Sequence, residues 1–301
     1  WLDDFAEFMA IKEHFGNQAL QKWDDKKAVA RDPSALDKYR SMLAEQIQYF
    51  KVTQYFFFKQ WTELKNYANQ KGIQIIGDMP IYVAADSVEV WTKPELFQLD
   101  EERNPLVVAG VPADQFSATG QLWGNPLYAW EEHKKQGYAW WIHRIEESFK
   151  IYDVLRIDHF KGFSDYWQVD GKAEVAKDGS WQPGPGYDLF KAVKEQLGDL
   201  PIIAEDLGNI DDKARKLLAD CNYPGMKILQ FGFEDVSGKS LDSPHYCIPH
   251  SIVYTGTHDN DVTNGWYNGL TAQQQQYIND YTHRHNDESI CQAMIRQLFA
   301  T

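Results

Sequence analysis

The segment RIDHF, residues 156–160, places a carboxylate directly after a short apolar run, and this arrangement recurs twice along the chain. AEDLG, residues 204–208, begins where the run 201–204 ends, and THDND, residues 257–261, follows the run 251–255. The runs are short, rich in β-branched residues and separated by helix-length stretches, so they predict buried parallel strands. Because strands of a β/α barrel present catalytic groups at their C-terminal ends, the three acids can converge on one point.

A fourth acid, Asp78, follows the run 73–77, and the run 226–231 predicts one more strand with no acid at its tip. Helical patterns occupy most of the intervals, at residues 128–150, 187–197, 211–220, 272–281 and 288–299. Alternating strands and helices predict an α/β fold of the (β/α)8 TIM-barrel type. Five predicted strands are fewer than the eight of a closed barrel, so we expect this barrel to be incomplete in the chain.

Composition narrows the class of protein. The chain has 301 residues, of which 43% are apolar, enough for one domain of barrel size. Its net charge of −14 disfavours nucleic acid as a partner, and no stretch is long and apolar enough to predict a membrane span. The chain opens inside an amphipathic pattern without an export leader, and its three cysteines have unrelated spacings, so we expect a cytoplasmic protein without disulfides.

Aromatic residues make up 14% of the chain, and flat rings are typical of sites that bind pyranose faces. Many of them have a structural explanation, because helical spacing predicts one long helix with a buried face formed by Leu36, Tyr39, Leu43, Ile47, Phe50, Phe57, Trp61 and Leu64. Ser34 and Asp37 predict its capping box, and Gly72 its end. Residues 110–126 and 178–186 are rich in Gly and Pro and predict loops.

Two carboxyl groups suffice to cleave an anomeric bond with retention of configuration: one attacks, and the other protonates the leaving oxygen. Asp158 suits the attacking role because the cation of Arg156 favours an ionised carboxylate. Glu205 follows an apolar run that favours the protonated acid. Asp259 is then predicted to stabilise the positively charged transition state. A single acid at a strand end is more often a cap or an ion-pair partner, but four such acids favour a site.

Four segments together resemble the signature segments of the 4-α-glucanotransferase family, the amylomaltases or disproportionating enzymes of the α-amylase clan. They are GDMPI at 77–81, RIDHF at 156–160, AEDLG at 204–208 and YTGTHDND at 254–261, in the family's order. The resemblance covers nearly the whole chain. It implies that residues 1–301 are part of a catalytic β/α barrel domain with a helical insertion at about 1–70, a lid loop at about 105–130 and a donor-side loop at about 170–187.

The resemblance implies an enzyme that moves 1,4-α-glucan segments between maltooligosaccharides through a covalent glycosyl-enzyme, without a cofactor or metal. It matches Asp158 to the nucleophile, Glu205 to the acid/base and Asp259 to the transition-state stabiliser, and it matches supporting residues around the bound sugar to Asp78, Arg156, His159, His258 and the lid aromatics Phe116 and Trp123. Either histidine taken alone is more often structural. Gln115 departs from the Tyr that many family members have there, which removes one aromatic acceptor contact.

Three other interpretations stay open at the level of sequence. An α-glucan hydrolase of the same clan would use the same acids, although its motifs place the histidine further from the nucleophile than His159. Family members extend beyond both ends of this chain, so we expect a fragment, which as presented is either active or a non-catalytic piece with weak glucan binding. A metal-dependent barrel would need Asp78, His159, Glu205 and His258 to share one ion, and no His-x-His or cysteine ligand spacing supports it.

Overall fold

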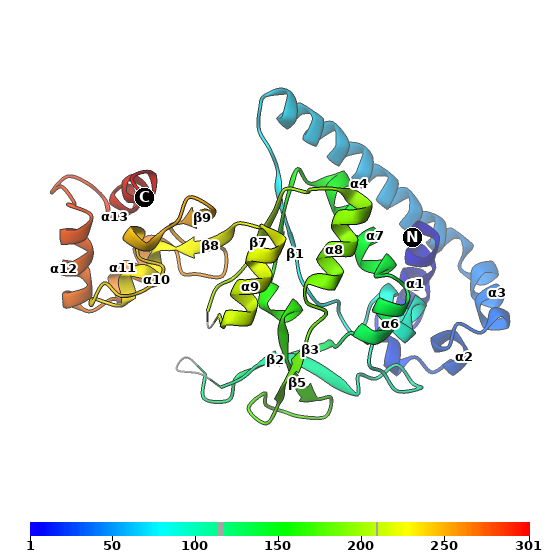
Figure 1. Ribbon diagram of the computed structural model, residues 1–301. Helices are drawn as coiled ribbons and strands as arrows, with labels where there is room; N and C mark the ends of the chain where they lie inside the picture. Colours follow the sequence, from blue (N-terminus) through cyan, green and yellow to red (C-terminus); the bar gives the residue numbers. More distant parts are fainter. Residues whose placement is uncertain (114–116, 209) are drawn as a thin grey trace. The chain divides into compact units, whose positions relative to one another are not determined.

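The computed structural model describes residues 1–113, 117–208 and 210–301, and its contacts divide the chain into two compact units, Trp1–Pro201 and Ile202–Thr301. Each unit combines helices with short strands, so the fold is of the mixed α/β class (Figure 1). No helix in the described ranges is both long enough and apolar enough to cross a bilayer. The three cysteines, Cys221, Cys247 and Cys291, are free thiols.

The first unit contains the longest helix and all of the antiparallel strands. Its elements are α1 (Leu2–His14), η1 (Leu20–Lys22), α2 (Lys26–Val29), α3 (Pro33–Met42), α4 (Ala44–Gln70), β1 (Ile76–Met79), α5 (Val88–Thr92), η2 (Pro94–Leu96), β2 (Val107–Val111), β3 (Gln121–Pro126), α6 (Trp130–Lys135), α7 (Ala139–Ile151), β4 (Val154–Ile157), η3 (Phe160–Phe163), β5 (Asp165–Asp170), β6 (Ser180–Pro183) and α8 (Tyr187–Leu197).

Strands β1 and β4 pair in parallel, as the two apolar runs predicted. The first strand begins later than expected, however, since β1 spans Ile76–Met79 and Asp78 lies within it. Just before the strand, the N–H of Ile75 donates to the Asp153 carboxylate at 2.8 Å. The two strands approach closely at Gly77, where an added Cβ would lie 2.0 Å from the ring of Tyr152. Gly77 is therefore required by packing against the chain that enters β4.

The predicted single helix from residue 34 to residue 72 is wrong in three respects. A break at Leu43 separates α3 from α4, and the N-cap of α3 is Asp32, whose carboxylate accepts from the Ser34 N–H at 3.0 Å. The predicted buried face holds for Leu36, Tyr39 and Leu43 but fails along α4, which has no buried residue; Phe57 is 47% exposed and Leu64 53%. Gly72 ends the helix with a positive φ, as predicted.

The two Gly/Pro-rich stretches are not loops throughout, which corrects the prediction for residues 110–126 and 178–186. Strands β2 and β3 occupy much of the first stretch and β6 much of the second, and with β5 they form an antiparallel sheet of order β3-β2-β5-β6. Trp167 pairs with Trp181 across β5 and β6, with ring centroids 5.2 Å apart. Partners distant in sequence therefore form this sheet where local composition predicts turns.

The second unit contains β7 (Ile202–Ala204), α9 (Asp212–Cys221), β8 (Gly225–Ile228), α10 (Leu229–Glu234), η4 (Pro244–Tyr246), β9 (Ser251–Tyr254), α11 (Thr263–Gly269), α12 (Ala272–Tyr281) and α13 (Ile290–Phe299) (Figure 1). Strands β8 and β9 pair in parallel, as predicted. The strand predicted at residues 226–231 ends at Ile228, because the chain turns into α10. Leu229 and Phe233 of α10 are fully buried and pack against Trp266 and Met294, so the core of this unit lies among its helices.

Candidate active site

The parallel register of β1 and β4 sets Asp78 directly beside Arg156. The Arg156 Nη1 atom lies 2.6 and 2.7 Å from the two carboxylate oxygens of Asp78 and 3.1 Å from Oδ1 of Asp158. Arg156 is buried at 7% exposure, whereas the side chains of Asp78 and Asp158 are 38% and 40% exposed. One buried cation thus holds two half-exposed carboxylates at the C-terminal ends of neighbouring strands through charge-assisted hydrogen bonds.

The backbone fixes Asp158 at the end of β4, since its N–H donates to the carbonyl of Met79 at 3.0 Å. His159 follows in the left-handed region with φ 49°, a conformation that is uncommon for a residue other than glycine. After it comes η3, where an added Cβ at Gly162 would lie 2.7 Å from Ile81 and 3.0 Å from the His159 ring. The sharp turn after Asp158 therefore needs both the strained His159 and the small Gly162.

Trp123 of β3 lies against the same turn. Its ring centroid is 4.8 Å from that of His159, edge to face, and 6.2 Å from that of Tyr82. Trp123 is 37% exposed. Tyr82 is buried, and its ring limits the movement of the Trp123 indole on one side. Burial, with a smaller contribution from Lys161, lowers the pKa of His159 to about 4. The imidazole is therefore neutral at neutral pH and offers one N–H donor and one acceptor.

In the second unit, Glu205 and Asp206 follow β7. One Glu205 carboxylate oxygen accepts from the N–H of Leu207 at 2.8 Å. Asp206 points into the structure, where it accepts from the N–H of Met226 at 2.7 Å, and burial raises its pKa. An added Cβ at Gly225 would lie 2.5 Å from Asp206. Of the two neighbouring acids, Asp206 thus holds β8 in place, whereas Glu205 bonds to the backbone of the loop that follows β7.

Asp259 stands in the loop that follows β9. The loop is tied by Asn260, whose side-chain oxygen accepts from the N–H of Thr257 at 2.8 Å and from its hydroxyl at 3.0 Å. The N–H of Asp259 donates in turn to the Thr257 hydroxyl at 3.3 Å. His258 Nε2 lies 3.4 Å from Asp259 Oδ1, and both side chains are well exposed. The loop therefore presents an acid beside a histidine, which suits contact with a polar ligand.

The structure brings together Asp78, Arg156 and Asp158, places His159 against Trp123, and pairs His258 with Asp259. Glu205 and Asp259 belong to the second unit, and Phe116 lies outside the described residues. Tyr82 was missed by the sequence reasoning, although its position shortly after Asp78 in the segment 77–83 was a usable signal. Arg144 was missed as well: it donates to the carbonyls of Pro80 and Ile81 at 2.7 and 3.0 Å and so supports that segment.

Comparison with known proteins identifies relatives over the whole chain. The family model described as 4-alpha-glucanotransferase matches residues 1–301. The chain belongs to the 4-alpha-glucanotransferase family. The 4-alpha-glucanotransferase of Streptococcus pneumoniae is 52% identical over 302 residues, which cover 100% of this chain and 60% of that protein. That of Clostridium butyricum is 47% identical, covering 89% of this chain and 55% of the relative. The chain thus spans about three fifths of the length of these relatives.

Solved structures agree with this assignment. The amylomaltase from Streptococcus agalactiae, solved in complex with acarbose, superposes with a TM-score of 0.98 at 61% identity, covering 100% of this chain and 61% of that one. The amylomaltase from Corynebacterium glutamicum shares the fold, with a TM-score of 0.69 at 17% identity over 99% of this chain and 39% of that one. The resemblance inferred from the four signature segments is confirmed at the level of the family.

Proposed function

We propose that this chain is the greater part of a 4-α-glucanotransferase that transfers 1,4-α-glucan segments between maltooligosaccharides with retention of configuration. The observation that carries the proposal is the pair of strand-end carboxylates, Asp78 and Asp158, on the buried Arg156 in a chain of this family. An ionised carboxylate held on a preorganised cation is what a nucleophile of a retaining mechanism requires. The activity is proposed for the complete enzyme, since the chain spans about three fifths of the length of its relatives.

In the proposed mechanism Asp158 attacks the anomeric carbon and forms the glycosyl-enzyme. Glu205 protonates the departing glycosidic oxygen and then, as a carboxylate, takes the proton of the acceptor hydroxyl as that hydroxyl displaces Asp158. Asp259 stabilises the positive charge of the flattened ring. These roles require all three carboxyl groups to face one glucose unit, with those of Asp158 and Glu205 roughly 5–5.5 Å apart, as in retaining enzymes.

The supporting residues would bind the sugar at the −1 position and the acceptor beside it. Asp78, Arg156, His159 and His258 offer charged or polar groups to hydroxyls, and the indole of Trp123 offers a flat face. Phe116 is proposed as a second lid aromatic. Transfer prevails over hydrolysis when the acceptor site binds sugar and excludes water, and the half-exposed Trp123 held by Tyr82 is suited to that.

We further propose that the complete enzyme closes a (β/α)8 barrel of which this chain carries a part. The exposed face of α4 supports this, because it includes Tyr49, Tyr55, Phe56 and Tyr67, and apolar surface of that extent is normally covered. Ile76 at the edge of β1 is also exposed, and an uncovered strand edge is a site for further pairing. A cytoplasmic location is proposed as well, supported by the three free thiols.

Incubation with maltotriose tests the proposal. The complete enzyme is expected to produce glucose together with longer maltooligosaccharides, separated by chromatography. Glucose and maltose alone would make it a hydrolase, and no change would remove the catalytic proposal. The same assay on residues 1–301 decides whether this part is active by itself. A chelator is expected to leave the activity unchanged, whereas its loss would favour the metal-dependent alternative.

A further inference from the structure

Two tryptophans from opposite edges of one sheet lie against residues 159–163, the turn that follows β4 (the 159–163 turn). In the sheet of order β3-β2-β5-β6, the edge strand β3 carries Trp123 and the edge strand β6 carries Trp181. Trp123 contacts the ring of His159, with centroids 4.8 Å apart. Lys161 Nζ lies over the other indole, 4.5 Å from the ring centroid of Trp181. The sheet therefore contacts the turn from both of its edges.

Trp181 is itself held in place by its neighbours in the sheet. It stands opposite Trp167 in the register of β5 and β6, and the two rings meet edge to face with centroids 5.2 Å apart. The indole N–H of Trp167 donates to the carbonyl of Ala176 at 2.7 Å. An added Cβ at Gly179 would lie 2.4 Å from the same indole nitrogen, so the chain passes close over Trp167. Trp181 is thus a preorganised ring, and a partner that packs on it loses little further freedom.

Main-chain bonds join the segment after β6 to the end of η3. The N–H of Gly184 donates to the carbonyl of Ser164 at 2.7 Å, and the N–H of Gly186 donates to that of Phe163 at 2.8 Å. An added Cβ at Gly184 would lie 2.3 Å from the carbonyl oxygen of Phe163, so only glycine permits this approach. The end of the 159–163 turn is therefore fixed by backbone, and Lys161 provides a side-chain contact from its middle.

The contact between Lys161 and Trp181 places a positive charge beside the imidazole of His159. A cation over the face of an indole is attracted by the negative charge of the ring face, and this attraction is stronger where water is partly excluded. Lys161 is half-buried. Its charge adds to the effect of burial in lowering the pKa of His159. The ring of Trp181 thus helps to keep the cation where it favours a neutral His159.

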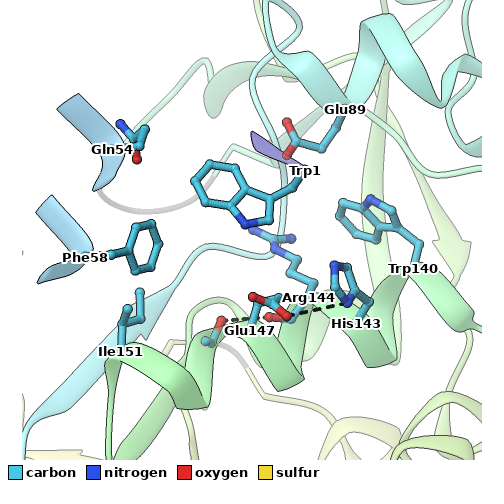
Figure 2. A pocket seen from close by; sticks show the side chains of 10 residues that line it. Trp1, Gln54, Phe58, Glu89, Trp140, His143, Arg144, Glu147 and Ile151 are labelled. Atoms are coloured by element: carbon cyan, nitrogen blue, oxygen red, sulfur yellow. Dashed lines mark hydrogen bonds and ion pairs between the residues drawn. The ribbon is translucent and has the colours of Figure 1, made fainter. Parts of the chain in front are cut away.

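A comparable contact supports the segment after the other strand-end carboxylate, Asp78. The guanidinium of Arg144 lies 5.3 Å from the ring centroid of Trp140, and Figure 2 shows both side chains extending from α7. Arg144 also donates to the carbonyls of Pro80 and Ile81 at 2.7 and 3.0 Å. A cation that packs on an indole therefore lies next to the segment after each of the two carboxylates that Arg156 holds.

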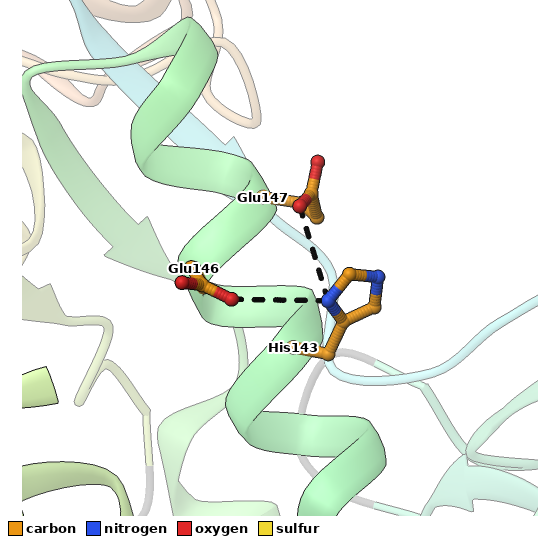
Figure 3. A group of neighbouring side chains, drawn as sticks. All are labelled: His143, Glu146 and Glu147. Atoms are coloured by element: carbon orange, nitrogen blue, oxygen red, sulfur yellow. Dashed lines mark ion pairs between the residues drawn. The ribbon is translucent and has the colours of Figure 1, made fainter. Parts of the chain in front are cut away.

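Charged groups on the exposed side of α7 differ from these two cations. His143 Nδ1 lies 3.9 Å from a carboxylate oxygen of Glu146 and 3.8 Å from one of Glu147 (Figure 3). The side chains of His143 and Glu146 are more than half exposed. Exposed pairs of this kind contribute little, because water competes for each partner and the side chains lose freedom. A half-buried lysine on a fixed ring can instead hold a defined geometry.

We propose that Trp181 is a positioning residue for the nucleophile. Through Lys161 it holds the 159–163 turn against the sheet, and it thereby keeps the carboxylate of Asp158 aligned for attack on the anomeric carbon. The inference rests on the proposed function, because that function gives Asp158 its attacking role. A misaligned nucleophile slows the chemical step even when the substrate binds as before. The effect of Trp181 should therefore appear in kcat and not in the affinity for glucan.

Kinetics and binding of the complete enzyme test this separation. We expect Trp181→Leu to lower kcat with maltotriose about tenfold, whereas Trp181→Phe keeps a ring and should retain most of the activity. Lys161→Met should match Trp181→Leu, and the double variant should lose no more than either change alone, since both remove one contact. The matched control Lys177→Met removes an exposed charge from the connection between β5 and β6 and should behave as the wild type.

Binding is measured by calorimetric titration with maltoheptaose in an Asp158→Asn background, where turnover is stopped. Adding Trp181→Leu should leave the dissociation constant unchanged, and weaker binding would overturn the inference by making Trp181 a sugar contact. Losses in kcat that multiply in the Trp181→Leu/Lys161→Met variant would contradict action through their contact. Wild-type kcat in Trp181→Leu, with or without a lower Tm, would leave Trp181 a structural residue only. The proposed function fails separately, when the wild-type enzyme forms no transfer products from maltotriose.

Discussion

Arg156 lies between two carboxylates that are far apart in sequence, Asp78 and Asp158. Its guanidinium matches the carboxylates with a fixed set of N–H donors, which the single ammonium of Lys cannot reproduce. We expect Arg156→Lys to lower kcat roughly 100-fold while leaving the fold intact. The Lys side chain keeps the positive charge but cannot reproduce the positions of the guanidinium N–H donors. Steady-state kinetics with maltotriose and far-ultraviolet circular dichroism measure the two effects. Activity close to wild type would remove Arg156 from the site.

Tyr82 positions Trp123 through its ring. Replacement by Leu removes that ring, so we expect Tyr82→Leu to raise the KM for an acceptor about fivefold with little change in kcat. Tyr82→Phe retains the ring and serves as the control, which should behave as the wild type. The measurement is the rate of transfer at varied glucose concentration. An equal loss in both variants would assign the effect to the hydroxyl and contradict the role given to the ring.

The sequence predicts those candidate site residues that come directly after a predicted strand. Asp158, Glu205 and Asp259 were predicted because each comes after an apolar run, and their catalytic roles stay predictions. The closeness of Arg156 to Asp158 in sequence predicted their contact, which the structure shows. The contact of Arg156 with Asp78 was not predicted, since it depends on the register of β1 against β4. The contact of Tyr82 with Trp123 of β3 also depends on tertiary packing, although the position of Tyr82 shortly after Asp78 was a usable signal.

Gly77 of β1 packs closely against the residues that enter β4. An added methyl group would lie 2.0 Å from the Tyr152 ring, so either β1 or the entry to β4 must shift. We expect Gly77→Ala to destabilise the protein by about 1–3 kcal/mol, the usual cost of overpacking. Thermal unfolding measures it. The control is Gly269→Ala at the end of α11, where an added Cβ meets no other atom within 4 Å. An unchanged Tm for Gly77→Ala would contradict the close packing.

Elements defined by local sequence were predicted well, and those defined by distant partners were not. Helices α8 and α12 have the predicted bounds, because their end signals are local: α8 lies between Gly186 and Gly198, and α12 begins at a capping box formed by Thr271 and Gln274. The residues of β3 and β6, with the last two of β2, were predicted as loops since Gly and Pro disfavour strands locally, yet pairing across the sheet stabilises these strands. The apolar spacing along α4 correctly predicted a helix. Periodicity does not show, however, which part of the protein covers the apolar face of a helix.

At the scale of the whole molecule, buried histidines make stability depend on pH. Burial lowers the pKa of His133 to about 4, from 6.5. Between these values the unfolded chain binds a proton that the folded chain does not, so stability falls as the pH falls from 6.5 toward 4. We expect His133→Gln to flatten this dependence in denaturant titrations. The control His143→Gln changes an exposed histidine and should keep the wild-type slope, and an unaltered slope in His133→Gln would contradict the assignment.

The account as a whole depends on a covalent bond between sugar and Asp158, and mass spectrometry tests it most directly. The complete enzyme is reacted with an activated maltosyl donor, quenched in acid and digested. We expect the peptide containing Asp158 to gain the mass of the transferred sugar, and the Asp158→Asn variant to gain none. Label on a different residue would contradict the account, as would the absence of label together with a product of inverted anomeric configuration.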